Sequence, residues 1–205
     1  MSIVRRWWPV VLFVAAALVV QKALFESRYD VSGHAAGHLM SASAPFAAFA
    51  LLATLLFVTP RARRDLLVLG TGAAWFGCTV LVLIGNVRVV DALVDAGKAH
   101  VSTDDLVQDA AIESAHDLAN LAPWLAVVAA LALTAAVWRS RQVSRRVAVA
   151  AAVLNLIFPP WVFPGAGLVV LTVARCIAHQ RGSDSDGLDA ARRQPGRNLE
   201  NAESR

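Results

Sequence analysis

The chain has 205 residues, of which 57% are hydrophobic and 17% are charged, and its formal net charge is +4. Soluble domains average about 45–50% apolar and about 25% charged residues, so this chain has too little charge to cover a water-exposed surface. Its 12 glycines and 2 cysteines exclude a collagen-like fibre and a disulfide scaffold. The composition therefore predicts an integral membrane protein of the all-α class, a polytopic helical bundle.

Long apolar segments divide the first two thirds of the chain. A bilayer core needs about 20 apolar residues per helix. Four clear transmembrane helices are predicted, at residues 7–25, 39–58, 66–86 and 121–138. The first is a retained signal anchor, because its apolar run continues past the small residues 15–17 and further spans follow. The third carries the small-residue pairs Gly70/Ala74 and Ala73/Gly77, for which we expect ordinary packing against helices of the same chain.

The last apolar stretch is broken by three prolines and two glycines within residues 159–167. One regular helix cannot continue through them. One alternative is a single kinked span that leaves the tail outside. The other is a C-terminal helical hairpin, with arms at 147–158 and 162–178, that returns the tail to the inside. We prefer the hairpin because Arg175 and Arg181 follow closely; each arm is short for a full crossing, which favours a partial, re-entrant insertion.

The basic residues indicate the topology. Arginine clusters at 5–6, 61–64 and 139–146 fall on one side of the predicted spans. The positive-inside rule places that side, and the N-terminus, in the cytoplasm of a multi-pass plasma-membrane protein. The basic balance thus reflects contact with the lipid bilayer, and no nucleic acid partner is expected. Residues 1–179 form the predicted bundle, and residues 180–205 a disordered cytoplasmic tail without large apolar side chains. The Ala/Val/Arg-rich usage is typical of a bacterium with a GC-rich genome.

The first predicted outer loop, 26–38, contains two histidines four residues apart, His34 and His38. On a helix this spacing places both imidazoles on one face, where they can chelate a transition metal. Two glycines in the same segment weaken the case for a helix, and a solvated loop with incidental histidines is the simpler alternative. A pH-sensing histidine pair is a third.

The second predicted outer loop, 87–120, is acidic. From about Thr103 its apolar residues recur at helical spacing, which predicts an outer amphipathic helix that leads into the fourth span. Within it, Glu113 and His116 match the Glu-x-x-His element of di-iron bundles, although only one copy is present. If the outer ends of the second and fourth spans adjoin, His34, His38, Glu113 and His116 form a cluster for a transition metal or a haem.

Three functions are compatible with these patterns. The first is a non-catalytic accessory or structural subunit that contacts other membrane-protein subunits. The second is a metal- or haem-binding membrane redox protein that uses the outer histidines and carboxylates. The third is a small transporter or channel built on the broken C-terminal helix, where Asn155 lies beside the break, although a tight turn explains that break more simply. No catalytic motif is present in the sequence, which favours a protein that is not an enzyme.

Overall fold

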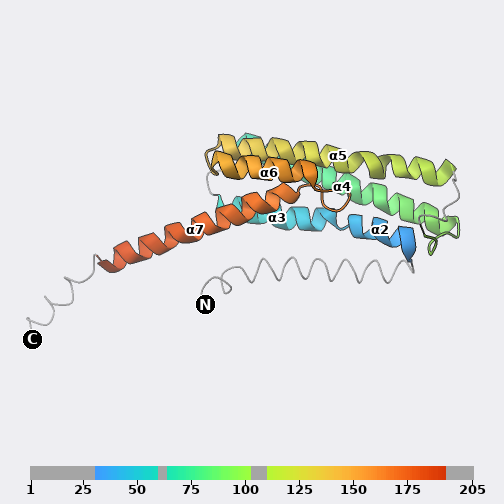
Figure 1. Cartoon of the computed structure of the whole chain (residues 1–205), viewed down its shortest axis with the longest axis horizontal. Helices are drawn as coiled ribbons and strands as arrows, with labels where there is room; N and C mark the ends of the chain where they lie inside the picture. Colours follow the sequence, from blue (N-terminus) through green and yellow to red (C-terminus); the bar gives the residue numbers. More distant parts are fainter. Residues whose placement is uncertain (1–30, 60–63, 103–109, 193–205) are drawn as a thin grey trace, which may run out of the picture.

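The computed structural model describes residues 31–59, 64–102 and 110–192 (Figure 1). These residues form an all-helical bundle, as predicted, and no strand occurs among them. The helices are α2 (Gly33–Ser41), α3 (Ala44–Val58), α4 (Leu66–Asp95), α5 (Ala110–Arg139), α6 (Arg145–Ile157) and α7 (Ala166–Arg192). The predicted span at 7–25 lies outside the described residues, as does the predicted helix start near Thr103.

Three segments of the described chain are long and apolar enough to cross a membrane. They are Gly33–Val58, which joins α2 and α3, Leu66–Asp95 and Ile112–Arg139. Each contains one of the predicted spans and extends beyond it toward the end of the bundle where His34, His38 and His116 lie. The helices therefore extend into both predicted outer loops, because α2 begins at Gly33 and α4 ends only at Asp95.

The α4–α5 pair is the most extensive helix contact in the bundle. Eight of the ten buried residues of α4 alternate at spacings of four and three along its length: Val68, Gly72, Trp75, Thr79, Val82, Asn86, Val89 and Leu93; the other two, Gly85 and Val90, are adjacent to members of this series. Buried residues of α5 recur in the same way and are mostly small: Ala119, Ala122, Ala126, Ala130, Leu133 and Val137. This period is that of a coiled-coil seam, so the two helices stay in register over their full length (Figure 1).

The second span consists of two helices with a break at Ala42 and Ser43. Pro45 causes this break, since it lies in the first turn of α3, lacks an N–H, and its ring would clash with the carbonyl of Ser41 in a continuous helix. The Ser41 hydroxyl donates to the carbonyl of Trp161 at 2.8 Å, which joins the break to the turn between α6 and α7.

The turn after α6 reverses the chain, and α7 packs along α6 in the opposite direction (Figure 1). The amide side chain of Asn155 accepts a hydrogen bond from the backbone N–H of Gly167 at 2.7 Å. A Cβ on Gly167 would overlap the carbonyl oxygen of Ala151, so only glycine allows the two helices to approach this closely. The indole N–H of the fully buried Trp75 donates to the Pro164 carbonyl at 2.9 Å.

Arg175 anchors α7 at the other end of the bundle. Its guanidinium donates to the Gln142 carbonyl at 2.8 Å and to the Val58 carbonyl at 3.2 Å. One side chain thus joins the end of α3, the α5–α6 turn and α7. The helix continues to Arg192, whereas the composition of residues 180–205 predicts disorder. Residues 193–205 lie outside the described residues.

We expect Gly167→Ala to destabilise the protein by about 3 kcal/mol or more, because overpacking at a backbone contact forces α6 and α7 apart. The measurement is thermal unfolding of the purified protein in detergent. Gly70→Ala is the matched control, since a Cβ there meets no atom of the described residues within 4 Å, and it should leave the stability unchanged or raise it by about 0.5–1 kcal/mol. Equal effects of the two substitutions would contradict this account of the α6–α7 contact.

Candidate metal centre

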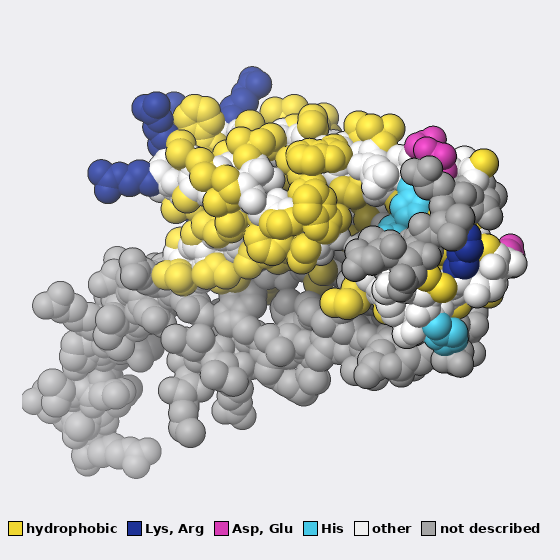
Figure 2. Space-filling model, turned by 45° about the vertical axis from the view of Figure 1, so that its right-hand side comes forward, with side chains coloured by type: hydrophobic (Ala, Val, Ile, Leu, Met, Phe, Trp, Pro, Cys, Tyr) yellow, Lys and Arg dark blue, Asp and Glu magenta, His cyan; other side chains and the backbone are white. Residues whose placement is uncertain are grey.

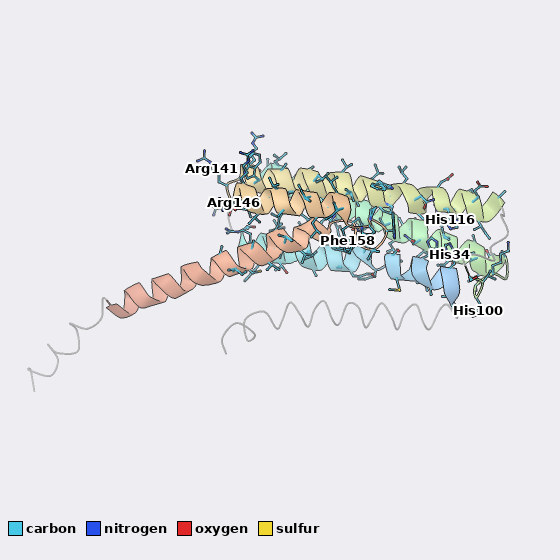
Figure 3. The ribbon with its side chains drawn as sticks, in the orientation of Figure 1. His34, His100, His116, Arg141, Arg146 and Phe158 are labelled. Atoms are coloured by element: carbon cyan, nitrogen blue, oxygen red, sulfur yellow. The ribbon has the colours of Figure 1, made fainter. Side chains whose placement is uncertain are left out.

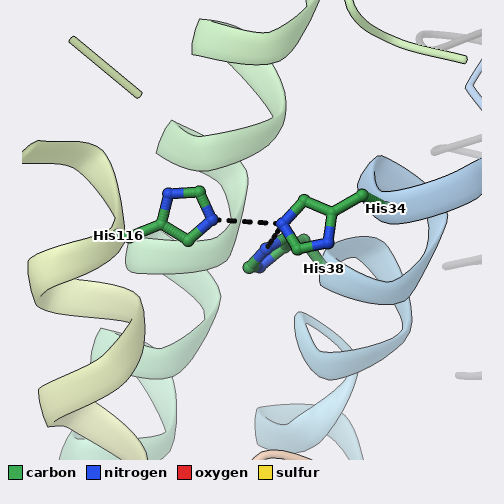
Figure 4. Close-up of side chains that lie close together, drawn as sticks. All are labelled: His34, His38 and His116. Carbon is green, nitrogen blue, oxygen red and sulfur yellow. Dashed lines mark hydrogen bonds between the residues drawn. The ribbon is translucent and has the colours of Figure 1, made fainter. Parts of the chain in front are cut away.

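Three imidazole rings meet between α2 and α5, at the end of the bundle opposite Arg141 and Arg146 (Figure 3). His34 and His38 lie one turn apart on α2, and His116 faces them from α5 (Figure 4). The Nε2 atom of His34 is 3.0 Å from Nε2 of His38 and 3.2 Å from Nε2 of His116. One nitrogen of each ring lies within 4.8 Å of the others, and all three residues are half-buried.

The other nitrogen of His38 is held by Asn86, which lies in the buried seam of α4. Nδ1 of His38 and Oδ1 of Asn86 are 2.6 Å apart. The Asn86 amide N–H donates to the carbonyl of Val82 at 2.8 Å, so its oxygen faces the imidazole and can only accept. His38 therefore carries its proton on Nδ1 when neutral, and the lone pair of Nε2 points toward His34.

His116 is fixed in the same tautomer by the backbone of its own helix. Its Nδ1–H donates to the carbonyl of Ile112 at 2.7 Å. Two Nε2 lone pairs, one from His38 and one from His116, thus converge on Nε2 of His34. A single proton on Nε2 of His34 can be shared between both lone pairs, and a metal ion can take the place of that proton. Ligating histidines in metal sites characteristically donate the second ring N–H to an oxygen in this way.

The two separations to Nε2 of His34 lie in the range expected of ligands on a single ion. With metal–nitrogen bonds of about 2.05 Å, two ligand nitrogens lie about 2.9 Å apart at a right angle and about 3.3 Å apart at the tetrahedral angle. The observed 3.0 and 3.2 Å fall between these values. Two histidines on opposite faces of a haem iron would hold their nitrogens about 4 Å apart, twice a metal–nitrogen bond. The arrangement fits a metal ion and does not fit a haem between these rings.

The start of α2 is held by the loop that follows α4. The backbone N–H of Ser32 donates to Ala99, and that of His34 donates to Val101, at 3.0 and 3.2 Å. Gly33 lies between them with φ +58, and a Cβ there would lie 2.5 Å from the Val101 oxygen. Glycine is required at this position because both its backbone conformation and the close approach exclude a side chain. This loop fixes where His34 enters the site.

The distance between α4 and α5 at the site is set by Gly85. A Cβ at this position would lie 2.8 Å from the backbone nitrogen of Ala119, so the two backbones are in contact there. Asn86 is the next residue on α4, and His116 lies one turn before Ala119 on α5. The contact brings the residue that orients His38 and the third histidine to the same level of the bundle.

The structure brings together three of the four residues that the sequence suggests as metal ligands. Glu113, the fourth, is exposed and is not part of the group formed by the three histidines. His100 is exposed and its ring contacts the hydroxyl of Ser32 at 3.1 Å. Asn86 is the last residue of the third predicted span, and it is not among the predicted metal ligands. Its place in the four-and-three spacing of α4 is the signal that identifies it as a buried polar residue.

Comparison with protein-family models, with curated proteins and with solved structures finds no match to this chain.

Replacing Asn86 with leucine should weaken metal binding by about 10–100-fold, the usual cost of removing a hydrogen-bond partner of a ligating histidine. His38 then loses the oxygen that fixes its tautomer and ring orientation. The measurement is competition with a chromophoric chelator. Asn86→Asp provides rescue, because a carboxylate accepts the same hydrogen bond. Wild-type affinity in the leucine variant would show that Asn86 has only a structural role.

Proposed function

We propose that this chain is a multi-span membrane protein that binds a divalent first-row transition metal through Nε2 of His34, His38 and His116. The observation that carries the proposal is the convergence of two oriented lone pairs on the third imidazole nitrogen. Single histidines on a helix face are common, whereas two fixed tautomers that point at one place are expected of a ligand set.

The donor type supports a particular class of metal. Neutral imidazoles suit zinc, copper, iron and nickel, whereas magnesium and calcium prefer oxygen ligands. Copper(II) has the strongest general affinity for such sites among the divalent ions of this row. Copper would supply the chemistry expected of a membrane redox protein, whereas zinc would serve a structural or hydrolytic role. The nitrogen separations do not support a redox protein that holds a haem between these histidines.

The membrane arrangement that we propose follows from the two ends of the bundle. Lysine and arginine side chains gather mostly at one end, and acidic and histidine side chains at the other (Figure 2). We place the arginine end in the cytoplasm and the metal centre at the outer end of a plasma-membrane protein. The three apolar segments, together with residues 7–25, make four spans, and α6 with α7 enters from the arginine side and returns to it.

The transporter or channel function and the accessory-subunit function have less support. The Asn155 side chain, which suggested a transport site, is occupied in joining α7 to α6 and lies 3.5 Å from the Thr134 hydroxyl. Such packing favours the turn over a substrate site. A role as a subunit of a larger complex is compatible with metal binding, and identification of co-purifying membrane proteins tests it separately.

The decisive test measures metal content and metal-induced stabilisation. The purified full chain is stripped with chelator, then loaded with Zn²⁺, Cu²⁺ or Co²⁺, with Mg²⁺ as the negative control. We expect one equivalent of transition metal and a rise in melting temperature, since a ligand at 100 times its Kd stabilises by about 2.7 kcal/mol. Binding should weaken as the pH falls, because protons compete for the same lone pairs.

Histidine variants locate that metal. His38→Ala and His116→Ala should each lose the bound equivalent and the visible absorption of Co²⁺. His100→Ala is the matched control, because that ring lies at the same end of the bundle but outside the group of three (Figure 3). Retention of the metal in both site variants, or its equal loss in the control, would refute the proposed site.

A further inference from the structure

A second candidate site lies at the opposite end of the bundle, on the surface where α5 and α6 meet. A groove of about 190 Å³ opens there between the two helices. Its lining is largely apolar and includes three alanines: Leu131, Thr134, Ala135, Trp138, Arg145, Ala148, Val149 and Ala152. The hydroxyl of Thr134 already donates to the carbonyl of Ala130 at 2.8 Å, so the groove itself demands no polar partner from its occupant.

Arginines surround the end of the groove where α5 passes into α6. Arg145 lines it directly, and Arg139, Arg141 and Arg146 are exposed nearby (Figure 3). The segment 138–147 contains four arginines and no acidic residue. Trp138 also lines the groove at this end, and it is 48% exposed. Tryptophan with arginine is the combination typical of the membrane–water interface.

The position of two of these arginines is unfavourable for helix stability. Arg145 and Arg146 occupy the first turn of α6, after the N-cap Ser144. Helix N-termini carry a partial positive charge, so cations are disfavoured there and anions are favoured. An anion held at this turn would be attracted both by the guanidinium groups and by the free N–H groups of the helix.

We propose that this groove binds one anionic phospholipid, with an acyl chain between α5 and α6 and the phosphate on Arg145. Charge complementarity selects this occupant, because an apolar groove that ends in arginines matches a molecule with an apolar chain and an anionic head. Basic pockets between helices on the cytoplasmic side of membrane proteins bind such headgroups. The inference rests on the proposed membrane arrangement and is independent of the metal centre.

Two other occupants are chemically conceivable and are separated by the test. Small residues on a lipid-facing surface also allow another helix to approach, either from a second copy of this chain or from residues 7–25. Neither a helix from a second copy nor one from residues 7–25 would make binding depend on the charge of a lipid headgroup.

The experiment counts lipids bound to the full chain in detergent by native mass spectrometry. The probes are phosphatidylglycerol and phosphatidylcholine with identical acyl chains. We expect one tightly bound phosphatidylglycerol, preferred at least about fivefold over phosphatidylcholine, the preference that one arginine near an anionic surface supplies. Arg145→Gln should abolish this preference. Arg88→Gln is the control, because Arg88 is exposed on α4, outside the groove and outside the first turn of α6.

A second pair of variants tests the groove itself. Ala152→Leu fills it and should remove the bound lipid of either type, whereas Ala150→Leu, which is exposed on α6 but outside the groove, should retain it. Thermal unfolding confirms that both variants fold. Equal binding of the two lipids to the wild type, or an unchanged adduct in Ala152→Leu, overturns the proposal. A dimer that Ala152→Leu dissociates would also overturn it and identify a second copy as the occupant.

Metal binding separates this proposal from the proposed function. The groove variants should bind the same equivalent of Zn²⁺ or Co²⁺ as the wild type, because the groove and the histidines lie at opposite ends of the bundle (Figure 3).

Discussion

Backbone contact between α4 and α5 at Gly85 and Ala119 is the constraint on which the rest of the arrangement depends. Two long helices pack this closely only when the facing residues are small, and α5 supplies alanines along nearly its whole contact face. Once the register is set there, Asn86 and His116 lie at one level of the bundle. A larger residue at position 85 would separate the helices and displace two parts of the site together.

The hydrogen bonds of Asn86 explain how a polar cluster is stable within an apolar bundle. A buried amide without partners costs about 1–3 kcal/mol, so Asn86 has to be paired at both ends of its side chain. Its N–H donates to Val82 and its oxygen accepts from His38, and the proton on His38 is thereby assigned. A requirement for stability thus also orients a lone pair. The physical demand to satisfy buried polar groups and the chemical demand to orient a ligand are met by one hydrogen bond.

The two ends of the bundle differ in chemistry because different elements meet at each. At the histidine end, α2, the loop after α4 and the first turns of α5 bring imidazoles together. At the arginine end, Arg175 joins α7 to the end of α3 and to the α5–α6 turn, and that turn presents its arginines. The proposed metal centre and the proposed lipid site lie at opposite ends of the bundle, and each is built from local contacts of its own.

Helical class, apolar segments and the unequal distribution of arginine are local properties of the chain, so composition and spacing are sufficient to predict them. The pair His34 and His38 is local too, because four residues on a helix place both rings on one face. Their meeting with His116 depends on packing between distant segments, and periodicity alone could not distinguish that histidine from Glu113, its exposed neighbour one turn away. The small residues illustrate the same limit. Gly70 and Gly77 show the expected spacing but meet open space among the described residues, whereas Gly85 and Gly167 make the close contacts. Which glycine contacts a neighbour depends on the register between helices, and that register is set by side chains brought together from both partners.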